Sequence, residues 1–318
     1  MRRATPHPSA SPTPSPARGE GLYGFAPPEL AAAPRGAAQL SPLVPGAVQI
    51  EDLADGSLAR IVIAAPPGTL ERRFVLAHGL RALAGGGELV ALAPKDRGGA
   101  RLRAELEGFG CVVVESARRH HRLCRVRRPP APRGLEAAIA EGGPRLVPSL
   151  GLWSQPGVFS WDRIDPGSAL LTQAPLALCG RGADFGCGAG VLARAALAFA
   201  EVGEIALIDI DARAVAAARR NVIDPRAHFA HADVRSPGAV PTGLDFVLMN
   251  PPFHEAGAQA RALGAAFIAA AARALAPGGR LVMVANIALP YEAVLAAHFA
   301  TVAPAARARG YKLIEARR

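Results

Sequence analysis

The tetrapeptide Asn250-Pro251-Pro252-Phe253 directly follows DFVLM, a short apolar run typical of a buried strand. Proline fixes φ and has no backbone N–H, so the turn after Asn250 offers hydrogen-bond acceptors and no donors. The acceptors are the Asn250 side-chain oxygen and the Pro251 carbonyl, which match the two hydrogens of a planar NH2 group. Phe253 could stack on a flat base. The tetrapeptide predicts an amine-binding turn, although alone it also fits an Asn-Pro turn with a core phenylalanine.

A second motif that could carry chemistry is the stretch Asp184–Gly190, which has the form D-x-G-x-G-x-G. Its glycines, Gly186, Gly188 and Gly190, let the backbone of a strand-to-helix turn approach a bound nucleoside. The helix that follows favours a negative ligand group at its N-terminus. Asp209 ends the strand-like run EIALID, where a carboxylate can accept hydrogen bonds from ribose hydroxyls. These residues predict a nucleoside-binding loop.

The acid of this loop separates two classes of cofactor site. Residues 188–193 also satisfy the loose dinucleotide fingerprint G-x-G-x-x-A, which leaves an NAD-binding oxidoreductase open. Asp184, two residues before the first glycine, makes the loop resemble motif I of class I S-adenosylmethionine-dependent methyltransferases. In that family the acid lies near the methionine part of the cofactor, and an acid at the place of Asp233 contacts adenine. The alternatives are a tight turn without a ligand and, for Asp233, a helix cap.

Four further stretches resemble the RsmC-type ribosomal small-subunit RNA guanine-N2 methyltransferases. They are PGVFSWDRIDPGSALL, NPPFHEAG, RLVMVANIALPYEAVL and RGYKLIEARR. The resemblance covers about residues 155–318 closely and about 60–128 loosely, where the family has a degenerate copy of the domain without a cofactor loop. It implies that the Asn250–Phe253 loop holds the target amine and that Gly167-Ser168 lies near the cofactor.

The resemblance supplies a set of site residues and a cofactor, S-adenosyl-L-methionine. The cofactor-binding residues are Ser168, Asp184, Gly186, Gly188, Gly190, Asp209, Asp233 and Asn250. The catalytic residues are Asn250, Pro251, Pro252 and Phe253. His254 and Glu255 are candidate bases, but we interpret them as residues that shape the loop or begin the next helix.

The implied reaction is methylation of the exocyclic N2 of a guanine in small-subunit (16S) ribosomal RNA. Three alternatives stay open. Protein glutamine-N5 methyltransferases and N6-adenine methyltransferases share the N-P-P-F tetrapeptide, and a non-catalytic RNA-binding or assembly protein would need no turnover.

The elements that must position these residues occur twice along the chain. Strand-like and helix-like segments alternate from residue 59 to about 128 and again from about 182 to 286, which predicts α/β units with parallel sheets. We expect a tandem of Rossmann-like class I methyltransferase domains. Residues 1–45 are expected to be a disordered Pro/Ser/Ala-rich tail, 46–140 a degenerate domain and 141–318 the catalytic domain. The segment CGRGA before Asp184 predicts a poor strand.

The charge balance is basic, with a formal net charge of +10. Residues 1–150 hold 20 Lys/Arg and 13 Asp/Glu, a surplus of seven, and this half includes the run RRHHRLCRVRR at 118–128. Such a run fits an RNA-phosphate patch or a solvated edge strand whose charges block aggregation. The expected partner is ribosomal RNA or the small ribosomal subunit.

Cysteine usage and hydropathy exclude other classes of protein. The four cysteines form no C-x-x-C pair, so we expect no metal site, no disulfide framework and a reducing compartment. No apolar run reaches the length of about 18–20 residues that spans a bilayer. The opening MRR is not followed by the apolar stretch of a secretory signal. We therefore expect a cytoplasmic monomer without a membrane partner.

Overall fold

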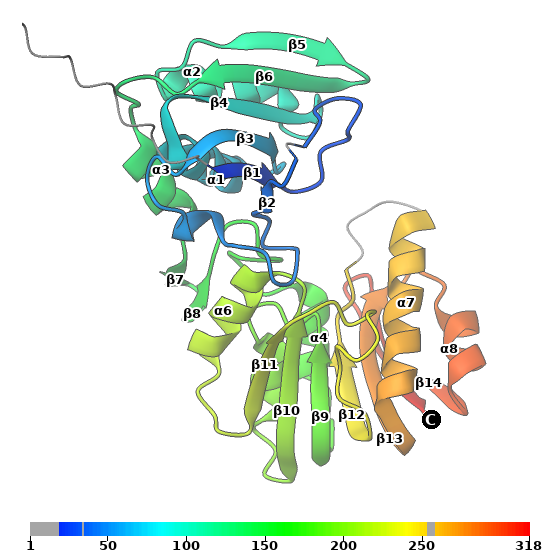
Figure 1. The fold of residues 1–318 in the computed structure, drawn as a ribbon. Coiled ribbons are helices and arrows are strands. Elements are labelled where there is room, and N and C mark those ends of the chain that lie inside the picture. The colour runs from blue at the N-terminus through cyan, green and yellow to red at the C-terminus, as the bar shows by residue number, and fades with distance from the viewer. Residues whose placement is uncertain (1–18, 34, 253–257) are drawn as a thin grey trace, which may run out of the picture.

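The computed structural model describes residues 19–33, 35–252 and 258–318, which form two α/β units, one above the other in Figure 1. The first contains a six-stranded sheet of order β2-β1-β3-β4-β6-β5. The second contains a seven-stranded sheet of order β11-β10-β9-β12-β13-β15-β14. The expected tandem of Rossmann-like units is confirmed.

The first unit places all its helices against one face of its sheet. Its elements are β1 (Gly19–Tyr23), β2 (Ala38–Gln39), β3 (Leu58–Ala64), α1 (Thr69–Ala82), β4 (Leu83–Pro94), α2 (Leu102–Gly108), β5 (Val114–Arg118), β6 (His121–Arg127) and α3 (Leu135–Gly142), with single 3-10 turns at Ile50–Asp52 and Gly99–Arg101. Ile61 and Ile63 of β3 point into the core under the helices, whereas Val62 points to the other face. That other face is covered by Leu30 and Ala31 of the segment after β1.

The structure of residues 19–33 and 35–45 corrects our expectation that residues 1–45 form a disordered tail. β1 lies in this stretch and pairs in parallel with β3. Tyr23 and Leu40 are 5% and 0% exposed, so apolar burial holds the segment on the sheet. Gly21 fits closely here, because a Cβ would lie 2.8 Å from Leu40 Cδ1 and the leucine side chain would have to shift. Residues 1–18 of the expected tail lie outside the described residues.

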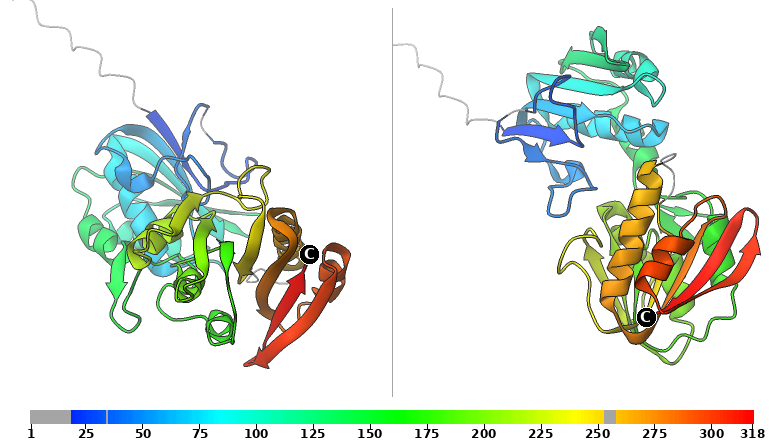
Figure 2. Two further views of the ribbon diagram at one scale, coloured as in Figure 1. Left: turned by 90° about the horizontal axis from the view of Figure 1, so that it is seen from below. Right: turned by 90° about the vertical axis from the view of Figure 1, so that its right-hand side faces the viewer.

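The second unit has helices on both faces of its sheet. Its elements are α4 (Pro166–Thr172), β9 (Gly180–Phe185), α5 (Val191–Ala196), β10 (Val202–Asp209), α6 (Ala212–Asn221), β11 (Ala227–His231), β12 (Leu244–Met249), α7 (Ala258–Ala274), β13 (Leu275–Asn286), α8 (Glu292–His298), β14 (Thr301–Ala308) and β15 (Tyr311–Arg317). Val247 and Met249 of β12 join the core formed with α7 and α8, and Phe246 and Leu248 join the core formed with α4, α5 and α6. The right-hand view of Figure 2 shows α7 and α8 together on one side of this sheet.

Each sheet is parallel, as expected, except at one side. β6 is antiparallel to both β4 and β5, and β15 is antiparallel to both β13 and β14. A short turn joins β5 to β6 and another joins β14 to β15, and two strands joined by a tight turn can pair only in antiparallel fashion. The two units therefore share the same departure from a parallel sheet.

β9 is a central strand, contrary to the poor strand expected from CGRGA. It pairs in parallel with β10 on one side and β12 on the other. The glycine at 182 makes room for a neighbour, because a Cβ there would lie 2.1 Å from Cζ of Phe246. The apolar volume that a branched residue normally brings to this strand is supplied by the ring of Phe246.

Between the sheets lie α3 and the hairpin of β7 (Arg145–Val147) and β8 (Leu152–Ser154). α3 packs on α1, and Gly142 at its end sits against Phe74, where a Cβ would lie 2.3 Å from the Phe74 Cβ. The helical layer of the first unit thus runs to Gly142, just past the boundary expected at residue 140. Within the described ranges, no helix combines the length and apolar character that a bilayer-spanning segment needs.

Candidate active site

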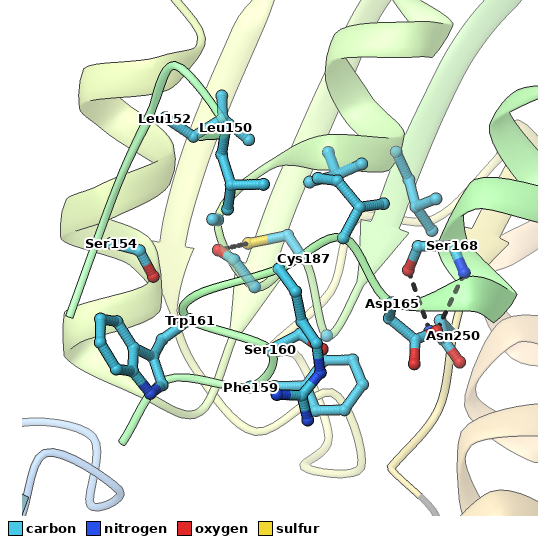
Figure 3. Close-up of a pocket in the computed structure, with 17 residues that line it drawn as sticks. Leu150, Leu152, Ser154, Phe159, Ser160, Trp161, Asp165, Ser168, Cys187 and Asn250 are labelled. Atoms are coloured by element: carbon cyan, nitrogen blue, oxygen red, sulfur yellow. Dashed lines mark hydrogen bonds between the residues drawn. The ribbon is translucent and has the colours of Figure 1, made fainter. Parts of the chain in front are cut away.

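The Asn250 side chain is held by the start of α4. Its Nδ2 donates to Asp165 Oδ2 at 2.9 Å and to Ser168 Oγ at 3.0 Å (Figure 3). Asp165 is the N-cap of α4 and also accepts from the Ser168 backbone N–H at 3.0 Å, with Pro166 at the first helical position. Because a carboxylate only accepts, the contact with Asp165 fixes which end of the Asn250 amide is the donor.

The other end of that amide, Asn250 Oδ1, is an acceptor that no described residue uses. Asn250 is 8% exposed, and its buried Oδ1 has no hydrogen-bond partner among the described residues. A buried polar atom without a partner costs free energy, about 1–3 kcal/mol. An N–H from a bound molecule would satisfy it. The structure thus presents an oriented, unused acceptor at the end of β12.

The glycine loop lies beside Asn250. Gly186, Gly188 and Gly190 have positive φ angles of 72°, 52° and 85°. Residues other than glycine rarely adopt such angles. Gly190 also packs against α6, since a Cβ there would lie 2.9 Å from Val222 Cγ2. Residues 186–189 line a cavity together with Ser168 and Asn250. The structure therefore brings Ser168, Gly186, Gly188 and Asn250 to one cavity.

Asp184 ties the loop to the helix that follows it. It is fully buried, and its Oδ2 accepts from the Ala193 backbone N–H of α5 at 3.1 Å. Its Oδ1 has no partner in the described part of the chain. Burial raises the pKa of the Asp184 carboxyl to about 7. The side chain holds the loop geometry and keeps one oxygen unpaired.

Asp209 bridges the glycine loop and the turn after β10. Its two oxygens accept from the backbone N–H groups of Gly188 and Asp211, each at 2.9 Å. Burial raises the pKa of the Asp209 carboxyl to about 6. Each oxygen retains a lone pair, so the carboxylate can accept further hydrogen bonds from a ligand.

Asp233 behaves as the turn residue that the sequence left open. It accepts from the Arg235 backbone N–H at 2.9 Å, and the Arg235 guanidinium lies 2.6 Å away. This ion pair lowers the pKa of the Asp233 carboxyl. Neither Asp233 nor Asp209 is among the residues that line the cavity beside Asn250.

The cavity has walls that sequence reasoning did not name. Residues 159–161 and 163–165, between β8 and α4, line it, and so does Ser154 of β8 (Figure 3). Ser154 is 2% exposed, and its Oγ has no partner among the residues that the structure describes. Asp165 was also missed, although Asp165-Pro166 before an apolar run is a helix-start signal. Pro251 is buried and Pro252 exposed, while Phe253, His254 and Glu255 lie outside the described residues.

Comparisons with known proteins identify the family of this chain. The profile of the methyltransferase small domain matches residues 149–315. A ribosomal RNA small subunit methyltransferase C from Pseudomonas aeruginosa (strain LESB58) is 32% identical over 288 residues, 88% of this chain and 86% of the relative. The chain belongs to the ribosomal RNA small subunit methyltransferase C family.

Other members of this family are similar at comparable levels. The protein of the same name from Pseudomonas syringae pv. syringae (strain B728a) is 34% identical over 257 residues, 76% of this chain and 74% of the relative. The solved structure of the T. thermophilus 16S rRNA N2 G1207 methyltransferase, in complex with AdoMet and guanosine, has a TM-score of 0.74. That structure is 25% identical, with 96% of this chain and 89% of the other chain covered.

The first unit of this family member contains a counterpart of the Asn250 turn. β3 occupies the place of β12 in its sheet, and it is followed by Ala65-Pro66-Pro67. Alanine replaces the asparagine, and Arg72 Nη1 donates to the carbonyl of Pro66, the counterpart of Pro251, at 3.3 Å and to that of Pro67 at 2.7 Å. Arg72 is fully buried and forms two hydrogen bonds of 2.7 Å with Glu105. The counterpart thus has no side-chain acceptor, and its carbonyls are already used.

Proposed function

We propose that this protein transfers a methyl group from S-adenosyl-L-methionine to the exocyclic N2 of a guanine in small-subunit ribosomal RNA. The observation that carries the proposal is the buried Asn250 Oδ1, an acceptor without a protein partner at the end of β12. The two similar proteins from Pseudomonas are named for ribosomal RNA, and the T. thermophilus protein for guanine N2 of 16S rRNA. The partner is then ribosomal RNA or the small subunit, and the protein acts as a cytoplasmic monomer.

The residues beside Asn250 fit S-adenosyl-L-methionine. A loop with three left-handed glycines leaves backbone surface open to a ligand, and Asp209 offers free lone pairs to ribose hydroxyls. Ser168, Asp184, Gly186, Gly188 and Gly190 would surround the methionine side of the cofactor, and Asp233 would need to exchange its Arg235 contact to reach adenine. When bound, the cofactor supplies a methyl group on a positively charged sulfur, which leaves as a neutral thioether.

The role of Asn250 and Pro251 follows from the weakness of the nucleophile. The lone pair of a guanine amine is delocalised into the ring. Acceptance of its two hydrogens by Asn250 Oδ1 and the Pro251 carbonyl favours a pyramidal nitrogen and stabilises the positive charge that develops. The N–CH3 bond forms as the S–CH3 bond breaks, and one amine proton leaves to solvent. Pro252 limits the turn to acceptors, and Phe253 is proposed to stack on the base.

The test is transfer of labelled methyl to unmethylated small subunits or their RNA, followed by identification of the modified nucleoside. We expect N2-methylguanine from the native protein and a loss of at least about 100-fold in kcat for Asn250→Ala. Asn286→Ala is the matched control, because that asparagine ends the neighbouring strand β13 and its side chain accepts from the Ala288 backbone N–H of its own turn. Melting temperatures of both variants show whether the fold is intact.

Two other products would reject the guanine assignment. Label found only on the glutamine of a release factor would identify a protein methyltransferase, and N6-methyladenine would identify an adenine methyltransferase. Binding of NADH in place of S-adenosylhomocysteine would reject methyl transfer altogether.

A further inference from the structure

The first unit gathers basic side chains at one edge of its sheet. The carboxyl ends of β1, β3 and β4 share this edge because the three strands are parallel. β6 begins there, with His121 opposite Pro94, and β5 ends there, with Arg118 opposite His121. A concave surface at this point, which we call the hairpin cluster, is lined by Lys95, Ala117, Arg118, Arg119, His120, His121 and Arg122.

The charge of the hairpin cluster is only partly neutralised. Arg119 contacts Glu29 at 2.8 Å, and Arg122 lies 3.6 Å from Glu115. Glu115 is also shared with Arg103 at 3.8 Å. Lys95 and Arg118 are exposed and have no acidic partner within 4.0 Å in the described ranges. The surface therefore keeps a positive surplus.

The turn that joins β5 to β6 places residues with large side chains in the left-handed backbone conformation. Arg119 and His120 both have positive φ, at 46° and 62°. Hairpin turns of this kind favour Asn-Gly, because side chains clash in the left-handed region. The corresponding turn between β14 and β15 also has an arginine at its first position, Arg309 with φ of 49°, but a glycine at its second, Gly310 with φ of 81°. The first unit differs at the second position, where it keeps the bulky His120, and such strain is typical of functional sites.

An exposed aromatic ring lies at the carboxyl end of β1. Phe25 is 76% exposed, two residues after the end of that strand, and the same segment continues to Glu29, which contacts Arg119. Exposed cations and an exposed ring at one edge of a sheet match single-stranded RNA, whose phosphates pair with the cations and whose bases stack on the ring. In Figure 1 the β5–β6 turn lies on the same side of the molecule as the first turn of α7, the helix after the Asn250 loop.

We propose that the hairpin cluster and Phe25 form a docking site for the phosphate backbone and an unstacked base of the substrate RNA. The site rests on the proposed function for the identity of that RNA. The degenerate unit thus binds RNA at the carboxyl edge of its own sheet. This edge corresponds to the edge of the second sheet at which the cofactor and the target amine bind. The counterpart turn, Ala65-Pro66-Pro67, cannot perform that second role, because it has no side-chain amide and its Pro66 and Pro67 carbonyls both accept from Arg72.

The experiment compares two full-length triple variants with equal loss of charge. The test variant is Lys95→Gln/Arg118→Gln/Arg119→Gln. The control is Arg181→Gln/Arg273→Gln/Arg317→Gln, whose exposed arginines lie at the opposite edge of the second sheet, at the start of β9 and the ends of α7 and β15. Each is titrated with unmethylated small-subunit ribosomal RNA over a range of salt concentrations. Phe25→Ser is tested in parallel.

We expect the test variant to bind RNA at least about tenfold more weakly and to lower the salt slope, −d log K/d log[salt], by about 2 to 3, because three phosphate contacts are lost. KM for RNA rises while kcat and the affinity for S-adenosylhomocysteine do not change. Phe25→Ser weakens binding with an unchanged salt slope. The proposal is overturned if the test and control variants have the same RNA affinity and slope. Absence of methyl transfer by the native protein would instead reject the proposed function, and the binding titration would still report on the hairpin cluster.

Discussion

Arg213 of α6 and Glu71 of α1 form an ion pair between the two units, with Nη1 and Oε1 2.7 Å apart and side chains 7% and 13% exposed. Arg213 Nε and Nη2 also donate to the two carboxylate oxygens of Asp211, at 3.0 and 2.8 Å. Asp211 in turn donates its backbone N–H to Asp209. Gly157 closes over the pair, since a Cβ there would lie 2.4 Å from Arg213 Nη1. The first unit thus reaches the predicted ribose carboxylate through one buried chain of contacts.

Glu71→Gln is expected to weaken both folding and cofactor binding. Loss of the charged hydrogen bond lowers the free energy of unfolding by about 1.5–3 kcal/mol. The Kd for S-adenosylhomocysteine rises several-fold, because Asp211 and Asp209 lose their anchor to the first unit. Urea unfolding and calorimetric titration measure the two effects. Glu107→Gln, which breaks the exposed pair with Arg103 on α2, serves as control and leaves both unchanged. Equal behaviour of the two variants would show that the buried pair does not support the site.

Asp165→Asn tests whether the orientation of the Asn250 amide matters. The asparagine offers one acceptor and one donor group in place of two acceptor oxygens, so it cannot fix the Asn250 amide as the carboxylate does. We expect kcat to fall by about 10–100-fold through misorientation of the acceptor, with a smaller change in KM for RNA. Steady-state kinetics on unmethylated RNA provide the measurement. Asp162→Asn, three residues earlier and exposed, is the matched control; full activity of Asp165→Asn would refute the positioning role.

The local patterns of the site were accessible from sequence, and its long-range contacts were not. The tetrapeptide, the glycine loop and the strand alternation are each encoded within a few residues. Asp165 was missed because its function depends on Asn250, which is 85 residues away. The tail was misjudged because the burial of Tyr23 depends on a core built from later strands. No propensity within residues 19–45 reports on that core.

The strand β9 illustrates the same limit at a central position. Gly180 and Gly182 give it a poor strand propensity, which sequence reasoning read correctly. The reason for these glycines is seen only when β12 is paired with β9. Gly180 then faces Asp245 and Gly182 faces Phe246, both of β12. Tertiary packing thus overrides propensity at the strand that carries Asp184.

His78 predicts a pH dependence of stability. It is 5% exposed, and neither ring nitrogen has a hydrogen-bond partner within the described ranges. Burial, assisted by Arg81, lowers the pKa of His78 from 6.5 to about 4. The unfolded chain therefore binds a proton more readily between these values. The contribution of His78 is complete above pH 6.5 and is lost as the pH falls towards 4, by up to about 3 kcal/mol.

Denaturant unfolding at several pH values measures this loss. In His78→Leu we expect the free energy of unfolding to lose the part of its pH dependence that arises between pH 6.5 and 4. The control His298→Gln, at an exposed histidine, keeps that pH dependence. If His78→Leu kept the same pH dependence of the unfolding free energy as the native protein, the effect would belong to other titratable groups.

Gly182→Ala tests the packing that lets a glycine-rich segment serve as the central strand. The new methyl group would occupy the space of the Phe246 ring, so the ring or the strand must move. Overpacking of this kind costs about 1–3 kcal/mol of unfolding free energy. The displacement also reaches Asp184, two residues on, so the affinity for S-adenosylhomocysteine falls. Gly203→Ala is the control, because its Cβ would find an ordinary contact of 3.6 Å with the Gly180 carbonyl.

A double mutant separates this clash from a general intolerance of alanine. Phe246→Leu removes the ring, so Gly182→Ala should cost less in that background than in the native one, with a coupling energy of about 0.5–3 kcal/mol. Urea unfolding of the native protein, both single variants and the double variant gives the cycle. Additive effects would mean that Phe246 is not the reason for the glycine, because only a shared contact makes the two substitutions interact.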